Sequence, residues 1–451
     1  MDPTATIAAL ATAPGPAGVA VVRVSGARAG TIAHALSGRA ELPHATLCYA
    51  TLREPATREA LDSGYVVRFD APRSFTGEDV AEFHVHGSPA VVDAVLAACV
   101  ALGARPAGPG EFTWRAWRAG KLDLAQCEGL LDLVCSRTDA ARRLALDQLD
   151  GALSRHIEAL RAPLLALLAD IEARLDFAHE PGVGDVDLDA VRRAMGEVCA
   201  QVESLVASVR AGRVRLHGAR VVLCGAPNAG KSSLFNALCG QDRALVHAAP
   251  GTTRDLVEAT TGPDGHFLTW VDTAGLRAAD DPVEQLGTER ALAAIAHADI
   301  VLWVQDGTQP PPDEAQRPPA SPRAIVIPVR TKADLAPQRL WRKVPRPTEA
   351  VSSVTSAGID ALRASVAAHV QALGDTTQTH GVAITRDRHR AALERAAAAL
   401  AQADRACQDR LPAECVADDL RAALGALGEI VGGVEVEDVL DAVFRRFCVG
   451  K

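Results

Sequence analysis

A glycine-rich stretch, GAPNAGKSS at residues 225–233, limits the possible folds of this chain more than any other feature. An apolar run at residues 221–224 precedes it and a helical pattern at residues 234–238 follows, which is the strand, loop and helix context of a phosphate-binding P-loop. Glycines free backbone N–H groups to surround phosphates, and the helix that follows begins with a partial positive charge. We expect Lys231 to reach the β- and γ-phosphates and Ser232 to hold Mg²⁺.

Two further nucleotide motifs follow in order. GTTRD at residues 251–255 lies where a switch loop would close over the γ-phosphate, and the hydroxyl of Thr253 would complete the coordination of Mg²⁺. DTAG at residues 272–275 comes next, with Asp272 expected to hold the water shell of the metal and the Gly275 N–H expected to contact the γ-phosphate. The spacing of the three motifs predicts a nucleoside triphosphate site.

The choice of base depends on TKAD at residues 331–334, which follows an apolar strand pattern at residues 324–329. Guanine presents its N1–H and N2–H donors side by side, and the carboxylate of Asp334 can accept both, whereas adenine would leave it unpaired. Lys332 would cover the plane of the base, and the loop at residues 351–353 would face guanine O6. These motifs predict GTP as the ligand.

The position that usually carries a water-orienting glutamine is occupied differently here. Leu276 and Arg277 follow the DTAG motif, so hydrolysis must use another group. Glu284, on the acidic segment at residues 280–285, is the candidate. The alternative is that this segment is only a solvated acidic loop.

Periodicity divides the chain into four parts. Short strand patterns alternate with helices in residues 1–121, residues 122–216 are helical, residues 217–373 return to an α/β pattern, and residues 374–451 are helical again. The fold class is therefore multi-domain, with an α/β N-terminal domain, an all-α domain, and a Ras-like α/β P-loop G domain inserted into the all-α domain. The proline-rich residues 310–322 predict a surface loop.

Bulk composition excludes several classes of protein. The net charge of −9 argues against a broad nucleic-acid-binding face, so we expect no DNA partner. We also expect no membrane contact, because the chain shows neither a signal-peptide pattern nor an apolar run long enough to span a bilayer. The ten cysteines form no C-x-x-C motif, which favours a reducing, cytoplasmic location. His84 and His86 share a strand face, but packing or turn formation is favoured over metal binding.

The complete set of motifs resembles the tRNA modification GTPase family MnmE, also called TrmE. The resemblance extends from TGED at residues 76–79 and GEFT at residues 110–113, through the nucleotide motifs and flanking helices, to the terminal FCVGK at residues 447–451. It implies a potassium-stimulated GTPase that dimerises through residues 1–121 and forms a heterotetramer with an FAD-dependent partner, MnmG. Together the two proteins would add a carboxymethylaminomethyl or aminomethyl group to C5 of the wobble uridine, U34, of certain tRNAs.

The motifs and the resemblance together nominate the site residues. The expected GTP contacts are Asn228, Ala229, Gly230, Lys231, Ser232, Ser233, Thr252, Thr253, Asp272, Thr273, Ala274, Gly275, Thr331, Lys332, Asp334, Ser352 and Ser353. The resemblance implies that K⁺ is held by Asn228, Thr252 and carbonyls near His247 and Ala249, and that Glu284 acts on water through a bridging water. It further implies that Arg23, Glu82, Lys121 and Lys451 bind a tetrahydrofolate derivative (the 5,10-methylene or 5-formyl form) and that Cys448 serves the modification chemistry.

Two positions depart from the family pattern. Thr331 stands where the guanine motif usually begins with Asn, which removes one hydrogen-bonding arm and predicts a lower guanine affinity. Ser353 stands where the family usually has Ala. Two alternatives stay open: a ribosome-assembly GTPase acting as a binding switch, and a stand-alone folate-dependent methyltransferase carrying a regulatory G domain.

Overall fold

The computed structural model describes residues 2–177, 184–239, 257–261, 268–273, 291–335, 341, 349–375, 382–432, 443–444, 447 and 450. The chain divides into two compact units. The first comprises Met1–Leu131, Gln148–Gly196 and Ala398–Lys451, and the second comprises Asp132–Asp147 and Glu197–Ala397.

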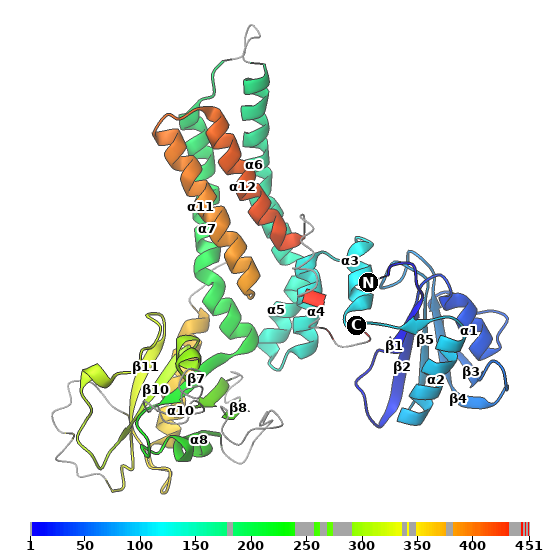
Figure 1. Cartoon of the computed structure of the whole chain (residues 1–451), viewed down its shortest axis with the longest axis horizontal. Coiled ribbons are helices and arrows are strands. Elements are labelled where there is room, and N and C mark those ends of the chain that lie inside the picture. Colours follow the sequence, from blue (N-terminus) through cyan, green and yellow to red (C-terminus); the bar gives the residue numbers. More distant parts are fainter. Residues whose placement is uncertain are drawn as a thin grey trace, which may run out of the picture. The chain divides into compact units, whose positions relative to one another are not determined.

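The first unit contains a six-stranded sheet with the order β3-β4-β5-β2-β1-β6 (Figure 1). Its strands are β1 (Ile7–Leu10), β2 (Ala17–Ser25), β3 (Cys48–Arg53), β4 (Ala60–Phe69), β5 (Val80–Gly87) and β6 (Arg105–Pro106). The short edge strand β6 runs parallel to β1, and the other pairs are antiparallel. An antiparallel sheet of this kind can bury one face and leave the other open.

The alternation of side chains along the strands separates the two faces of this sheet. Val22 and Phe83 are fully buried on one face, beneath the helices α1 (Ala29–Ser37) and α2 (Pro89–Ala101), whose apolar residues complete the same core. Arg23 alternates with these positions and therefore lies on the opposite face. The face that carries Arg23 is therefore not covered by α1 or α2.

Long helices make up most of the central and C-terminal regions. They are α3 (Glu111–Arg118), α4 (Leu124–Cys135), α5 (Asp139–Leu149), α6 (Ala152–Asp176), α7 (Leu188–His217), α11 (Asp387–Gln408) and α12 (Ala413–Val431). Helices α6 and α12 pack along their length because each carries an apolar stripe at helical spacing. The buried stripe of α6 comprises Leu153, Ile157, Leu160, Leu164, Leu168 and Ile171.

The helical region has more breaks than its periodicity predicts. Helix α5 begins after Thr138, whose hydroxyl accepts a hydrogen bond from the Ala141 N–H at 3.1 Å in the manner of an N-cap. Helix α6 begins after Gly151, which has a left-handed backbone with φ of 80°. The residues before α5 and α6 therefore divide a segment for which the sequence pattern predicts continuous helix.

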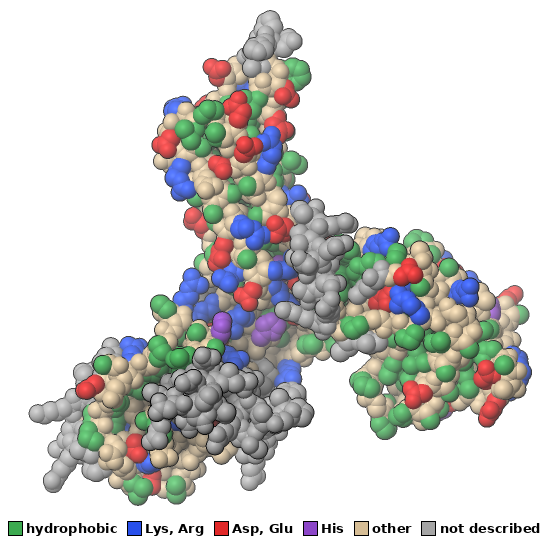
Figure 2. All heavy atoms as spheres, viewed as in Figure 1, with side chains coloured by type: hydrophobic (Ala, Val, Ile, Leu, Met, Phe, Trp, Pro, Cys, Tyr) green, Lys and Arg blue, Asp and Glu red, His purple; other side chains and the backbone are tan. Residues whose placement is uncertain are grey.

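Charged side chains of both signs are interspersed along the helices α7, α11 and α12 (Figure 2). Three ion pairs join parts of the first unit that are distant in the sequence: Arg192 with Asp404, Arg410 with Asp189, and Arg421 with Glu172. Each pair is solvent-exposed and therefore worth only about 0–1 kcal/mol. The helices are held mainly by their apolar stripes.

The second unit contains a six-stranded sheet with the order β12-β11-β10-β7-β9-β8 (Figure 1). Its strands are β7 (Ala219–Cys224), β8 (Val257–Thr261), β9 (Leu268–Asp272), β10 (Ile300–Asp306), β11 (Ile325–Thr331) and β12 (Glu349–Ala350). Among these strands, β8 is antiparallel to β9 and the other pairs are parallel. The carboxyl ends of β7, β9, β10 and β11 therefore meet at one edge, where ligands bind in open α/β sheets.

Both faces of this sheet are covered, as expected for parallel strands. The helices α8 (Lys231–Cys239) and α10 (Ile359–Asp375) share one core with the strands, and the helical residues 291–296 contribute to a second core on the other face. The proline-rich connection between β10 and β11 contains only a short 3₁₀ helix, η2 (Glu314–Gln316), among its described residues. Of the helices in the described ranges, none is both long and apolar enough to cross a membrane.

Candidate functional site

The P-loop lies between β7 and α8 and has the backbone that its glycines predict. At Gly225 φ is 153°, and an added Cβ would collide with the Val304 carbonyl oxygen of β10. Asn228 and Gly230 have φ of 61° and 90°, which places both in left-handed conformations. Asn228 is exposed, and its unusual backbone marks the point where the loop turns toward α8.

The predicted Mg²⁺ residues of the P-loop and of β9 lie together. The Ser232 hydroxyl donates a 2.6 Å hydrogen bond to Asp272 Oδ2. Asp272 Oδ1 is buried and has no hydrogen-bond partner among the described residues. A buried carboxylate oxygen without a hydrogen-bond partner, next to a serine hydroxyl, suits a divalent cation, because Mg²⁺ prefers hard oxygen ligands.

Burial changes the charge balance of this pocket. It raises the pKa of Asp272, which the Ser232 hydrogen bond and the nearby Lys231 only partly offset. Burial also lowers the pKa of Lys231, whose ammonium group donates to the carbonyl oxygens of Gly225 at 3.1 Å and Ala226 at 2.9 Å. The site therefore concentrates one cation and one anion where phosphates and their metal would bind.

The neighbouring Thr273 has a structural role. Its hydroxyl donates to the Leu223 carbonyl oxygen at 2.7 Å, and the side chain is fully buried. This contact joins the carboxyl end of β9 to that of β7, since Thr273 follows β9 directly. It fixes the position of Asp272 relative to the P-loop.

The predicted guanine residues lie on the other side of the P-loop. Lys332 donates to the Asn228 carbonyl oxygen at 3.0 Å and pairs with Asp306 at 2.7 Å. Asp334 is exposed, so its carboxylate is accessible to the N–H donors of a base. The Ser352 hydroxyl accepts from the Thr355 N–H at 3.2 Å, so this side chain stabilises its own loop.

Thr331, the first residue of the guanine motif, contacts the backbone of the P-loop. Its side chain is buried beneath the P-loop, where the hydroxyl lies 2.5 Å from the Ala229 carbonyl oxygen and 3.0 Å from that of Gln305. The sequence predicted that Thr331 lacks the hydrogen-bonding arm of asparagine toward guanine. It did not predict the contact of the Thr331 hydroxyl with Ala229.

Asp306 is the residue that sequence reasoning missed. Thr308 donates to its Oδ1 through both the backbone N–H at 2.9 Å and the hydroxyl at 2.7 Å, while Lys332 occupies Oδ2. Burial would raise the pKa of Asp306, but these contacts outweigh it and lower the pKa. The signal was present in the sequence, since Asp306 ends β10 after an apolar run and Gly-Thr follows it.

Several predicted site residues lie outside the described residues. They are His247, Ala249, Thr252, Thr253, Ala274, Gly275, Glu284, Cys448 and Lys451. Of the expected potassium ligands, only Asn228 is described.

The predicted folate residues Arg23 and Glu82 are in direct contact on the open face of the N-terminal sheet. Arg23 Nε lies 2.7 Å from Glu82 Oε1, because the two residues face each other in the β2–β5 register. The guanidinium group lies 5.6 Å from the ring centre of Phe75 and 5.7 Å from that of Phe112. Phe112 is fully buried, so the partly exposed Phe75 is the ring of the two that offers a stacking surface to a planar heterocycle with polar edges.

The environment keeps Glu82 ionised. Burial alone would raise its pKa, but the nearby His84 and Arg23 outweigh that effect and lower it. His84 Nε2 lies 3.4 Å from Glu82 Oε2, so this histidine has a carboxylate neighbour. Lys121 lies against the same loop as Phe75, because the methylenes of its side chain approach Gly77.

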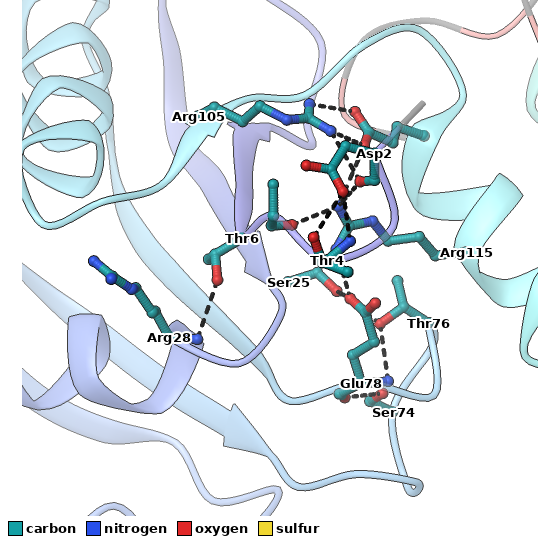
Figure 3. Close-up of polar contacts among 12 residues, drawn as sticks. Asp2, Thr4, Thr6, Ser25, Arg28, Ser74, Thr76, Glu78, Arg105 and Arg115 are labelled. Atoms are coloured by element: carbon teal, nitrogen blue, oxygen red, sulfur yellow. Dashed lines mark hydrogen bonds and ion pairs between the residues drawn. The ribbon is translucent and has the colours of Figure 1, made fainter.

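A buried polar network supports this loop (Figure 3). Glu78 Oε2 accepts hydrogen bonds from Arg115 at 2.7 Å and from Ser25 at 2.8 Å. Arg115 also contacts Glu111, which Arg105 binds through both carboxylate oxygens. The network joins β2, the TGED turn and α3, so the two N-terminal motifs of the sequence meet in space.

The described part of the C-terminal segment packs on the same unit. Phe444 and Phe447 lie in a core with Leu124 of α4. The backbone of Gly450, with φ of 101°, lies so close to Leu10 that an added Cβ would collide with the Leu10 carbonyl oxygen. Leu10 pairs with Val22, the neighbour of Arg23 in β2.

A P-loop at the carboxyl edge of a mainly parallel sheet, a hydrogen-bonded Ser–Asp pair beside it and a guanine motif define this protein as a P-loop GTPase. The family model for the MnmE helical domain matches residues 124–448, and that for the GTP-binding protein TrmE N-terminus matches residues 6–121. The chain belongs to the MnmE family of tRNA modification GTPases. The predicted multi-domain fold class is thereby confirmed.

Individual relatives match along the whole chain. A tRNA modification GTPase MnmE of Thermus thermophilus is 44% identical over 451 residues, covering 99% of each chain. That of Rhodospirillum rubrum is 45% identical over 464 residues, again covering 99% of each chain. Among solved structures, the G domain of the T. maritima FeoB iron transporter aligns with 34% of this chain and 99% of its own, at 26% identity and a TM-score of 0.27.

Proposed function

We propose that this protein hydrolyses GTP to drive modification of the wobble uridine of certain tRNAs. It acts with the FAD-dependent protein MnmG, and the pair adds a carboxymethylaminomethyl or aminomethyl group at C5 of U34. The observation that carries the GTPase part is the Ser232–Asp272 contact, with a buried carboxylate oxygen left for a metal. Relatives matching 99% of the chain carry the name tRNA modification GTPase.

In the nucleotide site, Ser232 and Thr253 hold Mg²⁺, and Asp272 orients the water shell of the metal. Bound Mg²⁺ and K⁺ supply positive charge against the phosphates. Asn228, Thr252 and the carbonyls near His247 and Ala249 form the potassium site. Glu284 orients the attacking water, because Leu276 and Arg277 offer no suitable group. The exposed Asn228 side chain at the turn of the P-loop supports its part in this arrangement.

In residues 1–121, Arg23, Glu82 and Lys121 bind the tetrahydrofolate derivative together with Lys451. The folate supplies a one-carbon unit. Glu82 accepts hydrogen bonds from pterin N–H donors, and the basic side chains pair with the glutamate tail. Gly450 contacts Leu10, which is paired with the neighbour of Arg23, and this contact supports a role for the C-terminal segment in chemistry at this site.

The open sheet face is the homodimer surface in this proposal. Val19, Tyr49 and Tyr65 are 59%, 59% and 49% exposed, and the two tyrosine rings stack edge to face at 5.6 Å. Large apolar side chains exposed on one face are typical of a protein interface. A second copy of the same face would cover them.

Reconstitution tests the proposal. The purified protein is mixed with the FAD-loaded flavoprotein, methylene-tetrahydrofolate, GTP, unmodified tRNA and either ammonium or glycine as the nitrogen donor, and the nucleosides are analysed by mass spectrometry. The proposal expects a new modified uridine that depends on both proteins and on K⁺ rather than Na⁺. Modification without the flavoprotein would favour the stand-alone methyltransferase, and no modification under any condition would contradict the proposal.

A further inference from the structure

Arginines concentrate on one part of the second unit. Residues 137–147, 204–220 and 382–395 hold eleven arginines and four acidic residues, in a chain whose net charge is −9. Figure 2 shows Lys and Arg side chains gathered over α5 and over the neighbouring ends of α7 and α11. We call the arginines of these three segments the arginine surface. None of them belongs to the nucleotide site or to the predicted folate site.

The three segments pack on one another, which brings their arginines together. Ala145 of α5, Leu216 of α7 and Ala383 lie in one apolar core. Gly212 of α7 approaches the next residue so closely that an added Cβ would collide with the Ile384 carbonyl oxygen. The apolar side chains therefore fill the contacts between the segments and leave arginines outside. Those that are exposed include Arg142, Arg143, Arg215 and Arg395.

Carboxylates are too few around α7 to neutralise its arginines one by one. The buried carboxylate of Asp299 pairs with both Arg210 and Arg213. Burial lowers the pKa of Arg210, and the nearby Arg213 and Arg323 lower it as well, while Asp299 acts in the opposite direction. Like charges are thus crowded here, and a bound anion would relieve their repulsion.

The arginines of α5 are accessible to such an anion. Asp139 is shared by Arg142 and Arg143, each at 2.6 Å. The two arginine side chains are 48% and 73% exposed, so these pairs contribute only about 0–1 kcal/mol each. A phosphate can replace Asp139 as their partner, because a guanidinium group binds phosphate through two parallel hydrogen bonds.

The kind of polyanion follows from the side chains that accompany the arginines. Of the exposed large apolar side chains among the described residues, none lies on α5, α7 or α11. Protein interfaces depend on aromatic and apolar anchors, and single-stranded nucleic acids are held by stacking of bases on aromatic rings. A surface of arginines without such groups fits the phosphate backbone of a base-paired helix.

We propose that the arginine surface binds the phosphate backbone of a base-paired arm of tRNA. The inference rests on the proposed function, which makes tRNA the substrate. Contacts of this kind position a nucleic acid without reading its sequence. The surface therefore orients the tRNA, and recognition of the wobble base occurs elsewhere.

The test measures the affinity of a fluorescein-labelled tRNA transcript for the full-length protein, by fluorescence anisotropy at several NaCl concentrations. Combining Arg142→Gln with Arg143→Gln should make the slope of log affinity against log salt less steep by about 1.4–1.8, since each phosphate contact contributes about 0.7–0.9. Affinity at 0.1 M NaCl should fall by about tenfold or more. Combining Arg215→Gln with Arg395→Gln should have the same effect.

The matched control combines Arg192→Gln with Arg410→Gln. These arginines of the first unit are 48% and 66% exposed and are also paired with carboxylates, so they resemble Arg142 and Arg143 in all but location. The control should bind the transcript like the wild type. A competing transcript with another base at the wobble position should displace the labelled one equally well. Exposed substitutions of this kind usually change stability by less than about 0.5 kcal/mol, and the second pair decides if the first fails to fold.

Wild-type tRNA affinity in both arginine pairs would overturn the proposal, and so would an equal loss in the control. Loss of flavoprotein binding with unchanged tRNA affinity would also overturn it and assign the surface to a protein. The modification assay separates this proposal from the proposed function. If the pairs lose tRNA affinity but the wild type leaves tRNA unmodified, only the proposed function fails. If the wild type modifies tRNA and the pairs bind it normally, only the arginine surface fails.

Discussion

Replacing Asp272 with Asn tests the metal site by removing charge while keeping the shape. Burial raises the pKa of Asp272, so the ionised carboxylate destabilises the fold at neutral pH until a cation offsets it. Its Oδ2 accepts the Ser232 hydroxyl at 2.6 Å, and its Oδ1 has no partner among the described residues. Hydrogen bonds to a charged group contribute about 1.5–3 kcal/mol. The factor by which Mg²⁺ raises nucleotide affinity should therefore be roughly 10- to 150-fold smaller in Asp272→Asn than in the wild type.

The assay is the dissociation rate of fluorescent GDP with Mg²⁺ and with EDTA. In the wild type, EDTA should speed dissociation by at least about tenfold, whereas in Asp272→Asn the two rates should agree within about threefold. Without nucleotide or metal, Asp272→Asn should unfold at the same temperature as the wild type or higher, because the cost of burying a charge is gone. A wild-type response of Asp272→Asn to EDTA would refute the reasoning.

Three other predictions concern separate parts of the chain. Arg115→Met removes one of the two arginine partners of buried Glu111, the other being Arg105, and should destabilise the N-terminal unit by about 1.5–3 kcal/mol, seen as faster hydrogen exchange in α3; unchanged exchange would contradict it. Because the pKa of Glu82 is lowered, its ionised form stabilises the N-terminal unit fully above about pH 4.5, and this stabilisation is lost as the pH falls through the lowered pKa. Glu82→Gln should therefore make the stability of this unit, monitored by hydrogen exchange, depend less on pH in the acid range. Glu284→Ala should slow GTP hydrolysis while GTP affinity stays near the wild-type value; unimpaired turnover would reassign the water-orienting group.

The elements around the nucleotide motifs can be predicted from the sequence because their determinants are local. Glycines at 225 and 230 specify the loop, and the apolar run before Asp272 specifies a strand that ends beside Ser232. Parallel strands bring such ends together whatever the rest of the chain does. The pairing of Arg23 with Glu82 depends on strand register, which the alternating patterns of β2 and β5 also constrain.

The contacts that the sequence did not reveal depend on tertiary packing. Whether Thr331 faces the base or the P-loop is set by Ala229 and Gly230, which lie about a hundred residues earlier. The break before α5 depends on a single side-chain cap at Thr138, a signal too weak to separate from the surrounding helical pattern. The buried network of Glu78, Glu111 and Arg115 joins charges that, by sequence alone, would be expected to be exposed.

The proposal that this GTPase takes part in wobble-uridine modification can be tested in cells. Its most direct test is nucleoside mass spectrometry of tRNA from a strain lacking the protein, complemented with the wild type or with Asp272→Asn expressed at the same level. We expect the C5 aminomethyl-type uridine to be absent in the deletion strain, to return with the wild type, and to stay absent or strongly reduced with Asp272→Asn. An unchanged wobble uridine in the deletion strain would contradict it.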